Sequence, residues 1–206
     1  MAPVVVDPDK VREFLTQADF ERWLAQHHAT ADEVWIRIFK KASGRASITP
    51  VEAIDAVLCW GWIDGIRKSW DEISFVQRYT PRKPKSVWSQ VNRDNIARLI
   101  EEGRMTEHGL QHVEAAKADG RWAAAYAAGS KMEMPDDLMA AIVANPAALA
   151  TFEELNKTNR FALAFRVGNL RTAAGRAKKI VGFVEMLARG ETIHPQKQKA
   201  QPAAQD

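Results

Sequence analysis

The chain has 206 residues and a formal net charge of +3; 46% of its residues are hydrophobic and 27% are charged. These values are ordinary for a globular protein, so they exclude a wholly disordered chain and a long coiled coil. A chain of this length buries roughly 70% of its unfolded surface, so its core needs neither a metal nor a disulfide. The single cysteine, Cys59, excludes an internal disulfide framework.

The segment 7–28 predicts a helical region. Its first two residues, Asp7-Pro8, form an N-cap followed by a proline at the first helical position. Apolar residues at i, i+3 and i+4 then form a helical stripe, Phe20, Trp23 and Leu24. The following run, 34–40, is rich in β-branched and aromatic residues and predicts a strand.

A capping box marks the next helix, because Thr49 precedes Pro50 and is followed three residues later by Glu52. We expect this helix to bury Ile54, Val57 and Leu58 and to end at Gly61. The runs 63–70 and 73–80 then predict two strands joined by a turn at Asp71-Glu72, and Pro81 ends the second strand.

From residue 86 onward the apolar period is helical. Ser89 is positioned to cap a helix that carries Ile96, Leu99 and Ile100, and Thr106 is positioned to cap the next one. Later helices are predicted to start at 135–137 and 145–146, to include 161–165, and to run from about Arg171 to Arg189. The polar segment that follows predicts a disordered tail.

These elements predict an α+β fold, with a small antiparallel or mixed sheet packed with helices and followed by a helical C-terminal region. Residues 1–86 form the α+β unit, residues 87–190 the helical region and residues 191–206 the disordered tail. The first two regions could form a single domain. The segment 1–6 has no basic residue and only three consecutive valines, so we expect no signal peptide, no membrane insertion and a cytoplasmic protein.

The stretch 60–89 is the strongest candidate for a functional site, because it contains four of the seven tryptophans together with glycines, an aspartate and arginines. Arginine beside aromatic rings suits phosphate, carboxylate or single-stranded nucleic acid, although the same stacking also packs surfaces. The tryptophans could line a ligand pocket or belong to the core. The candidate ligand-binding residues are Trp60, Trp62, Asp64, Arg78, Arg82, Trp88 and Asn92.

Asp64 leaves two interpretations open: a general acid or base, or half of an ion pair with Arg67, Arg78 or Arg82. Cys59 has no histidine near it in sequence, which disfavours a nucleophilic role.

His108 and His112 are four residues apart on a predicted helix, but they lack the His-Glu-x-x-His pattern and are expected to be solvated. No phosphate loop or nucleophile elbow is present. We therefore expect no cofactor and no metal, and no catalytic residue can be assigned.

The charge is unevenly distributed along the second half of the chain. Residues 157–189 contain eight lysines and arginines but one acid, Glu185, whereas residues 105–156 contain eight acids and three bases. This asymmetry indicates either ordinary solvated surfaces or a basic face that binds nucleic acid.

Several short segments, in this order, carry a resemblance to a known family: Glu33-Val34-Trp35-Ile36, Gly61-Trp62-Ile63-Asp64-Gly65, Arg78-Tyr79-Thr80-Pro81-Arg82, Trp88-Ser89 with Asn92, Arg98 to Met105, and Asp119-Gly120-Arg121-Trp122. They resemble the YdeI/OmpD-associated family, whose members are labelled bacteriocin-protection proteins, over about residues 20–190. The resemblance implies a role in tolerance of antimicrobial peptides or in envelope stress, and it supplies no reaction and no catalytic residues.

The sequence thus favours a non-catalytic protein that binds a small anionic or peptide ligand in a stress or antimicrobial-tolerance role. One alternative is an enzyme that uses Asp64 as acid or base in a pocket lined by tryptophan and arginine. The other is nucleic-acid binding through the basic C-terminal helices.

Overall fold

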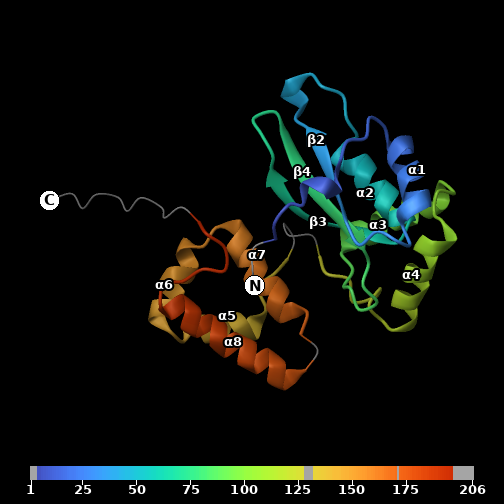
Figure 1. Cartoon of the computed structure of the whole chain (residues 1–206). Coiled ribbons are helices and arrows are strands. Elements are labelled where there is room, and N and C mark those ends of the chain that lie inside the picture. The colour runs from blue at the N-terminus through green and yellow to red at the C-terminus, as the bar shows by residue number, and fades with distance from the viewer. Residues whose placement is uncertain (1–3, 128–131, 171, 197–206) are drawn as a thin grey trace. The chain divides into compact units, whose positions relative to one another are not determined.

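A computed structural model describes residues 4–127, 132–170 and 172–196 of the chain. By its internal contacts the chain divides into two compact units, Met1–Ala125 and Tyr126–Asp206. The first unit contains a mixed four-stranded sheet with helices, and the second is helical (Figure 1). The predicted α+β fold is therefore confirmed.

The first unit is built from short strands, two 3₁₀ turns and four α-helices within its described residues. In chain order they are η1 (Pro8–Lys10), β1 (Val11–Arg12), α1 (Gln17–His27), β2 (Val34–Phe39), η2 (Lys41–Ser43), α2 (Pro50–Cys59), β3 (Trp62–Ser69), β4 (Ser74–Pro81), α3 (Gln90–Glu101) and α4 (Glu107–Ala118).

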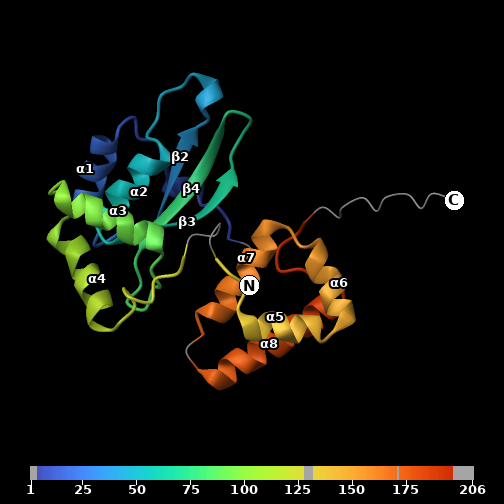
Figure 2. The same cartoon turned by 180° about the vertical axis from the view of Figure 1, so that it is seen from behind.

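The strands form one sheet in the order β1-β2-β4-β3, so β4 is an inner strand and β3 lies at an edge. β2 and β3 both pair with β4 in antiparallel fashion, whereas β1 pairs with β2 in parallel. The ladder between β3 and β4 shifts register between Asp64 and Arg67, and Gln77 Nε2 donates to the Gly65 carbonyl there at 2.7 Å. α1 to α4 lie on the same side of the sheet in both views (Figures 1 and 2).

The helix starts follow the local signals of the sequence. The capping box of α2 is confirmed, because Thr49 Oγ1 accepts from the Glu52 amide and the Glu52 carboxylate accepts from the Thr49 amide. α1 has a second capping box, Thr16 with Asp19, which the sequence analysis missed. The helical region predicted from Asp7 is wrong in extent, because only the turn η1 follows this cap and β1 separates it from α1.

The main core of the first unit lies between the sheet and helices α1 and α2. Its buried side chains come from every part of this layer: Phe20, Leu24, Val34, Ile36, Ile38, Ile48, Val57, Trp62 and Tyr79. A neighbouring cluster joins the end of α2 to α3 and α4 and contains Leu58, Trp88, Ile96, Leu99 and Val113. Ile100, which was expected on the same stripe, is 45% exposed. Helix α2 therefore belongs to both clusters.

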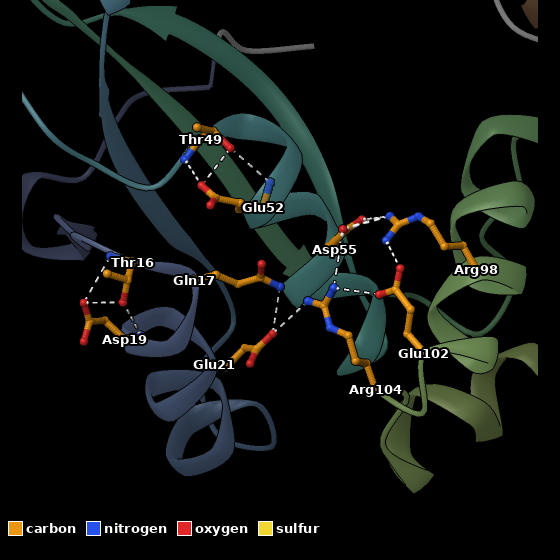
Figure 3. Close-up of polar contacts among 10 residues, drawn as sticks. All are labelled: Thr16, Gln17, Asp19, Glu21, Thr49, Glu52, Asp55, Arg98, Glu102 and Arg104. Atoms are coloured by element: carbon orange, nitrogen blue, oxygen red, sulfur yellow. Dashed lines mark hydrogen bonds and ion pairs between the residues drawn. The ribbon is translucent and has the colours of Figure 1, made fainter.

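A buried carboxylate, Asp55, ties α2 to α3. It is 6% exposed and accepts two hydrogen bonds from Arg98 Nη2, at 2.7 and 2.8 Å. Figure 3 shows Arg104 beside it, where its guanidinium reaches Glu21 and Glu102 at 3.1 Å each and Asp55 at 3.7 Å. This network connects α1, α2, α3 and the segment before α4 through charged side chains.

The second unit contains α5 (Asp136–Val143), α6 (Pro146–Glu154), α7 (Lys157–Gly168) and α8 (Ala173–Ala188). Leu138, Phe152, Leu163, Ile180 and Leu187 are among the side chains that form its core. The helices predicted for this region are confirmed, although Arg171, the expected first residue of the last one, lies outside the described residues.

The fully buried Asn159 holds the C-terminal segment of this unit against α7. Its side-chain amide donates to the His194 carbonyl and to Gln196 Oε1, and its Oδ1 accepts from the His194 amide at 2.8 Å. Within the predicted tail 191–206, residues 194 and 196 are therefore fixed by hydrogen bonds. Residues 197–206 lie outside the described residues.

The predicted domain division after residue 86 stays a prediction, because domains are defined by independent folding as well as by contacts. By contacts alone, α3 and α4 belong with the sheet, since both pack against α2.

Replacing Asp55 with alanine should destabilise the first unit by about 2–3 kcal/mol. Removing one partner of a buried ion pair typically costs about 3–5 kcal/mol, and the lower figure reflects the 41% exposure of Arg98. Glu114→Ala provides a matched control, because its ion pair with Lys117 is exposed and should contribute less than about 1 kcal/mol. Denaturant unfolding of both variants measures the difference, and equal losses would show that the Asp55 network does not stabilise the unit.

Candidate functional site

Arg82 and Trp88 lie together at the end of the inner strand β4. The guanidinium carbon of Arg82 is 3.6 Å from the centroid of the Trp88 ring, and Arg82 Nη1 donates to the Val87 carbonyl at 3.3 Å. Arg82 is 5% exposed and Trp88 is 2% exposed. A desolvated cation over an indole face contributes about 2 kcal/mol, so this pair fixes the segment between β4 and α3.

Trp122, which follows α4, extends the pair into a larger arrangement. Its ring meets Trp88 edge to face, with 4.9 Å between centroids. Two further cations lie over Trp122, Arg93 of α3 at 5.4 Å and Lys117 of α4 at 5.9 Å. We refer to Arg82, Trp88, Arg93, Lys117 and Trp122 as the arginine–tryptophan cluster.

The cluster contains nitrogen donors that no described residue satisfies. Arg93 Nε is buried and has no hydrogen-bond partner within the described part of the chain, and the same is true of Trp88 Nε1. Nor does Arg93 form an ion pair with any described residue, whereas Lys117 pairs with Glu114 at 2.8 Å. A buried donor without a partner costs about 1–3 kcal/mol, so an anion that accepts a hydrogen bond from Arg93 would offset this cost.

A second buried arginine, Arg121, holds the segment that carries Trp122. Its Nε lies 2.9 and 2.7 Å from the two oxygens of Asp119, and its Nη1 donates to the Ser86 carbonyl at 3.0 Å. Arg121 therefore connects the end of α4 to the segment before α3.

Asp64 lies on β3 opposite Tyr79, on the helix-covered face of the sheet. Burial raises the pKa of the Asp64 carboxyl, while its own backbone amide and the charges of Arg82 and Arg67 oppose the rise. Burial also raises the pKa of Tyr79, and the charge of Asp64 adds to this effect. Asp64 thus interacts electrostatically with two of the three arginines that were considered as its partners.

The third arginine, Arg78, has a different partner. It forms an ion pair with Glu33, with Nε and Nη2 at 2.6 and 2.5 Å from Glu33 Oε2. Since side chains alternate along a strand, Arg78 points to the face of the sheet opposite to that of Asp64.

The other candidate residues are placed outside the cluster or at its margin. Trp62 is fully buried in the main core and donates from Nε1 to the His28 carbonyl at 3.1 Å. Trp60 is partly buried, with its ring 4.8 Å from that of His28. Asn92 is half-buried in the first turn of α3, where its amide donates to Ser89 Oγ. The structure thus brings Asp64, Arg82 and Trp88 into one neighbourhood and separates Trp62 and Arg78 from it.

Helix α4 is attached to the end of α2 through backbone contacts. The Cys59 carbonyl accepts from the amide of Thr106 at 3.2 Å and from its hydroxyl at 2.6 Å. Thr106 also caps α4 by accepting from the Gly109 amide. A methyl group at residue 109 would lie 2.2 Å from the Cys59 oxygen, so glycine is required for this approach.

The two histidines of α4 are half-buried, so the expectation that they are solvated is wrong. His108 lies between His28 and His112, at centroid distances of 4.6 and 5.5 Å. Among the residues that the structure describes, no group of three or more His, Cys, Asp or Glu side chains is arranged to hold a metal ion.

Three of the eight basic residues in 157–189 contact carbonyls or carboxylates of the second unit itself. Arg160 donates to the carbonyls of Leu155 and Glu153 at the end of α6. Arg176 forms a two-pronged ion pair with Asp137, and Arg189 pairs with Glu191 at 2.9 Å. These contacts favour the structural interpretation of this charge, and nucleic-acid binding stays a prediction.

The part played by Arg93, Lys117 and Trp122 was not predicted from the sequence. Trp122 belongs to one of the segments that carry the family resemblance, which was a usable signal. Arg93 and Lys117 carry no such signal in the sequence, because each looks like an ordinary charged residue on a helix surface.

Comparison with known families gives a different match for each part of the chain. Residues 12–112 match a family described as a domain of unknown function (DUF8412). Residues 131–190 match the family described as bacteriocin-protection, YdeI or OmpD-associated. No curated protein and no solved structure matches the chain.

The expected family is thereby confirmed, but the match lies in the second unit. The segments that suggested it all precede residue 123, and most of them fall within the match to DUF8412. The stretch that matches the YdeI/OmpD-associated family therefore follows, in the sequence, the unit that contains the arginine–tryptophan cluster. Within the described residues, no helix is both long and apolar enough to cross a membrane.

Cys59 should resist alkylation in the folded protein. Burial raises the pKa of its thiol to about 11, so at pH 8 the reactive thiolate is about a hundredfold less abundant than in an ordinary cysteine. Incubation with iodoacetamide at pH 8, followed by mass spectrometry, should show little modification of the native protein and complete modification after unfolding in denaturant. Rapid modification of the native protein would contradict the buried position of this side chain.

Proposed function

We propose that this protein is a non-catalytic binding protein, and that its arginine–tryptophan cluster holds a small anionic molecule or a peptide with a free carboxylate or phosphate. The observation that carries the proposal is the half-buried Arg93, whose guanidinium has no hydrogen-bond or ion-pair partner among the described residues. A carboxylate or phosphate would supply the missing acceptor, because a guanidinium fork matches either group in geometry.

The surroundings of Arg93 support an anionic ligand over a neutral one. Lys117 is exposed and shares the ring of Trp122 with Arg93, so two cationic side chains from different helices converge on one indole. Arg82, which is 5% exposed and interacts electrostatically with Asp64, lies over the neighbouring Trp88. Low local dielectric strengthens the attraction of such charges for an anion.

The biological role that we propose rests on the family match of residues 131–190. The match to the bacteriocin-protection family at residues 131–190 supports a role in stress or in tolerance of antimicrobial peptides. In this setting the first unit would bind the ligand.

Arg93→Gln should weaken ligand binding by about ten- to a hundredfold, because a hydrogen bond to a charged group contributes about 1.5–3 kcal/mol. Thermal-shift measurements with inorganic phosphate, citrate and an acidic tripeptide would identify a stabilising ligand, and calorimetric titration would then compare the variants. Arg22→Gln is the matched control, since Arg22 is an exposed arginine of α1 with 75% of its side chain accessible. Equal binding by wild type and Arg93→Gln would discard this site.

A second candidate function is an enzyme that uses Asp64 as acid or base. The raised pKa of its partly buried carboxyl supports this alternative, because general acids and bases work best when their pKa approaches the working pH. Any turnover found in a screen of hydrolytic and proton-transfer reactions should fall at least about a hundredfold in Asp64→Asn. Asp94→Asn, a change at an exposed carboxylate of α3, should leave it unaltered. Turnover that survives Asp64→Asn would remove the proposed role.

A further inference from the structure

Three imidazole rings from two helices form a continuous row in the first unit. His28, directly after α1, lies edge to face with His108 of α4, and His108 lies edge to face with His112 one turn later. His28 Nδ1 is 3.0 Å from the Leu24 carbonyl. Since a carbonyl only accepts, Nδ1 is the donor in this contact. We refer to His28, His108 and His112 as the histidine row.

The row lies where α4 meets the junction between α2 and β3. Gly61, at this junction, adopts a φ of +70°, and a methyl group placed on it would lie 2.4 Å from His112 Cδ2. The ring of Trp60 contacts that of His28 at 4.8 Å. The rings are therefore packed side by side against the backbone, and they join the end of α1, the α2–β3 junction and the first turns of α4.

The charged groups around the row are mainly cationic. The positive charge of Arg82, after β4, lowers the pKa of His112, and so does that of Arg121, after α4. The nearby carboxylates interact with these arginines: Asp119 forms an ion pair with Arg121, and Asp64 interacts electrostatically with Arg82.

Within the described part of the chain, no carboxylate is among the groups that shift the pKa of His108 or His112. Helix α2 contributes Cys59, whose thiol is neutral because its pKa is about 11. Burial lowers the pKa of both His108 and His112, and the neighbouring imidazoles add to this effect.

We propose that the histidine row is an acid-released clasp, which holds α4 against α1 and the α2–β3 junction while its imidazoles are neutral and loosens α4 when they become protonated. Neutral rings pack edge to face without charge repulsion. Two protonated rings about 5 Å apart repel each other, and the arginines beside them repel both.

The direction of the pH effect follows from the lowered pKa values of His108 and His112. A free histidine has a pKa near 6.5, so above this pH both the closed and the opened forms are neutral and the clasp has its full strength. As the pH falls below about 6.5, the opened form binds protons more readily than the closed form, and opening becomes progressively easier.

Hydrogen exchange of the full-length protein at pH 7 and pH 5 tests the clasp. After correction for intrinsic exchange rates, the protection of the α4 amides should be roughly fourfold or more lower at pH 5 than at pH 7. A factor of about four corresponds to the repulsion between two unit charges 5 Å apart in water. Helix α8 contains no histidine and should keep its protection, so it serves as the internal reference.

The double variant His108→Gln/His112→Gln should lose the acid-dependent fall in α4 protection, because glutamine does not titrate. His27→Gln is the matched control, since the ring of His27 contacts Trp23 outside the row; this variant should behave like wild type. A fall of the same size in the double variant, or no fall in wild type, would overturn the proposal.

A measurement on the wild-type protein keeps the test decisive even where the double variant does not fold. NMR titration of the imidazole carbon-bound protons should place the midpoints of His108 and His112 below 6.5, and the α4 amide signals should shift or broaden over the same pH range. Midpoints at or above 6.5, or α4 signals unaffected across the titration, would overturn the proposal.

Discussion

The contact between the end of α2 and the start of α4 is the constraint on which the first unit depends. A single carbonyl, that of Cys59, accepts two hydrogen bonds from Thr106, and Gly109 allows the two backbones to approach closely. The hydroxyl of Thr106 serves both as the helix cap of α4 and as the link to α2. This arrangement satisfies backbone groups that a helix end would otherwise leave unpaired, and it sets the position of α4.

Two groups of side chains depend on this placement of α4. One turn into the helix, His108 and His112 are held over Gly61 and beside His28. At the other end, Lys117 lies over the following Trp122, whose ring also meets Arg93 of α3 and Trp88. The Asp55 network fixes α3 to the same helix α2 (Figure 3), so α2 is the common support of both groups.

Arg93 differs from most of the other arginines in the contacts that it makes. In the second unit, Arg160, Arg176 and Arg189 are occupied with carbonyls and carboxylates of the unit itself. In the first unit, Arg78, Arg98 and Arg121 likewise pair with carboxylates, whereas Arg93 has no such partner among the described residues. The proposed ligand chemistry is therefore placed in the first unit, whereas the family match to YdeI/OmpD-associated proteins concerns the second.

The sequence by itself determined most of the secondary structure and the fold class. Capping residues such as Thr49 and Thr106 and the apolar periods act within one turn or one strand, so their effects can be read from neighbouring residues. The two-residue strand β1 was missed, because such a short strand has no period of its own and forms only by pairing with β2.

The tertiary structure decided which of the candidate side chains meet. Trp62 and Trp88 are both tryptophans of one motif, yet one lies in the main core and the other beneath Arg82. The pairing of Arg78 with Glu33, and the meeting of Arg93 with Trp122, join residues far apart in the chain. Such contacts depend on strand register and helix docking, which are set by the packing of the whole unit and not by the residues next to each side chain.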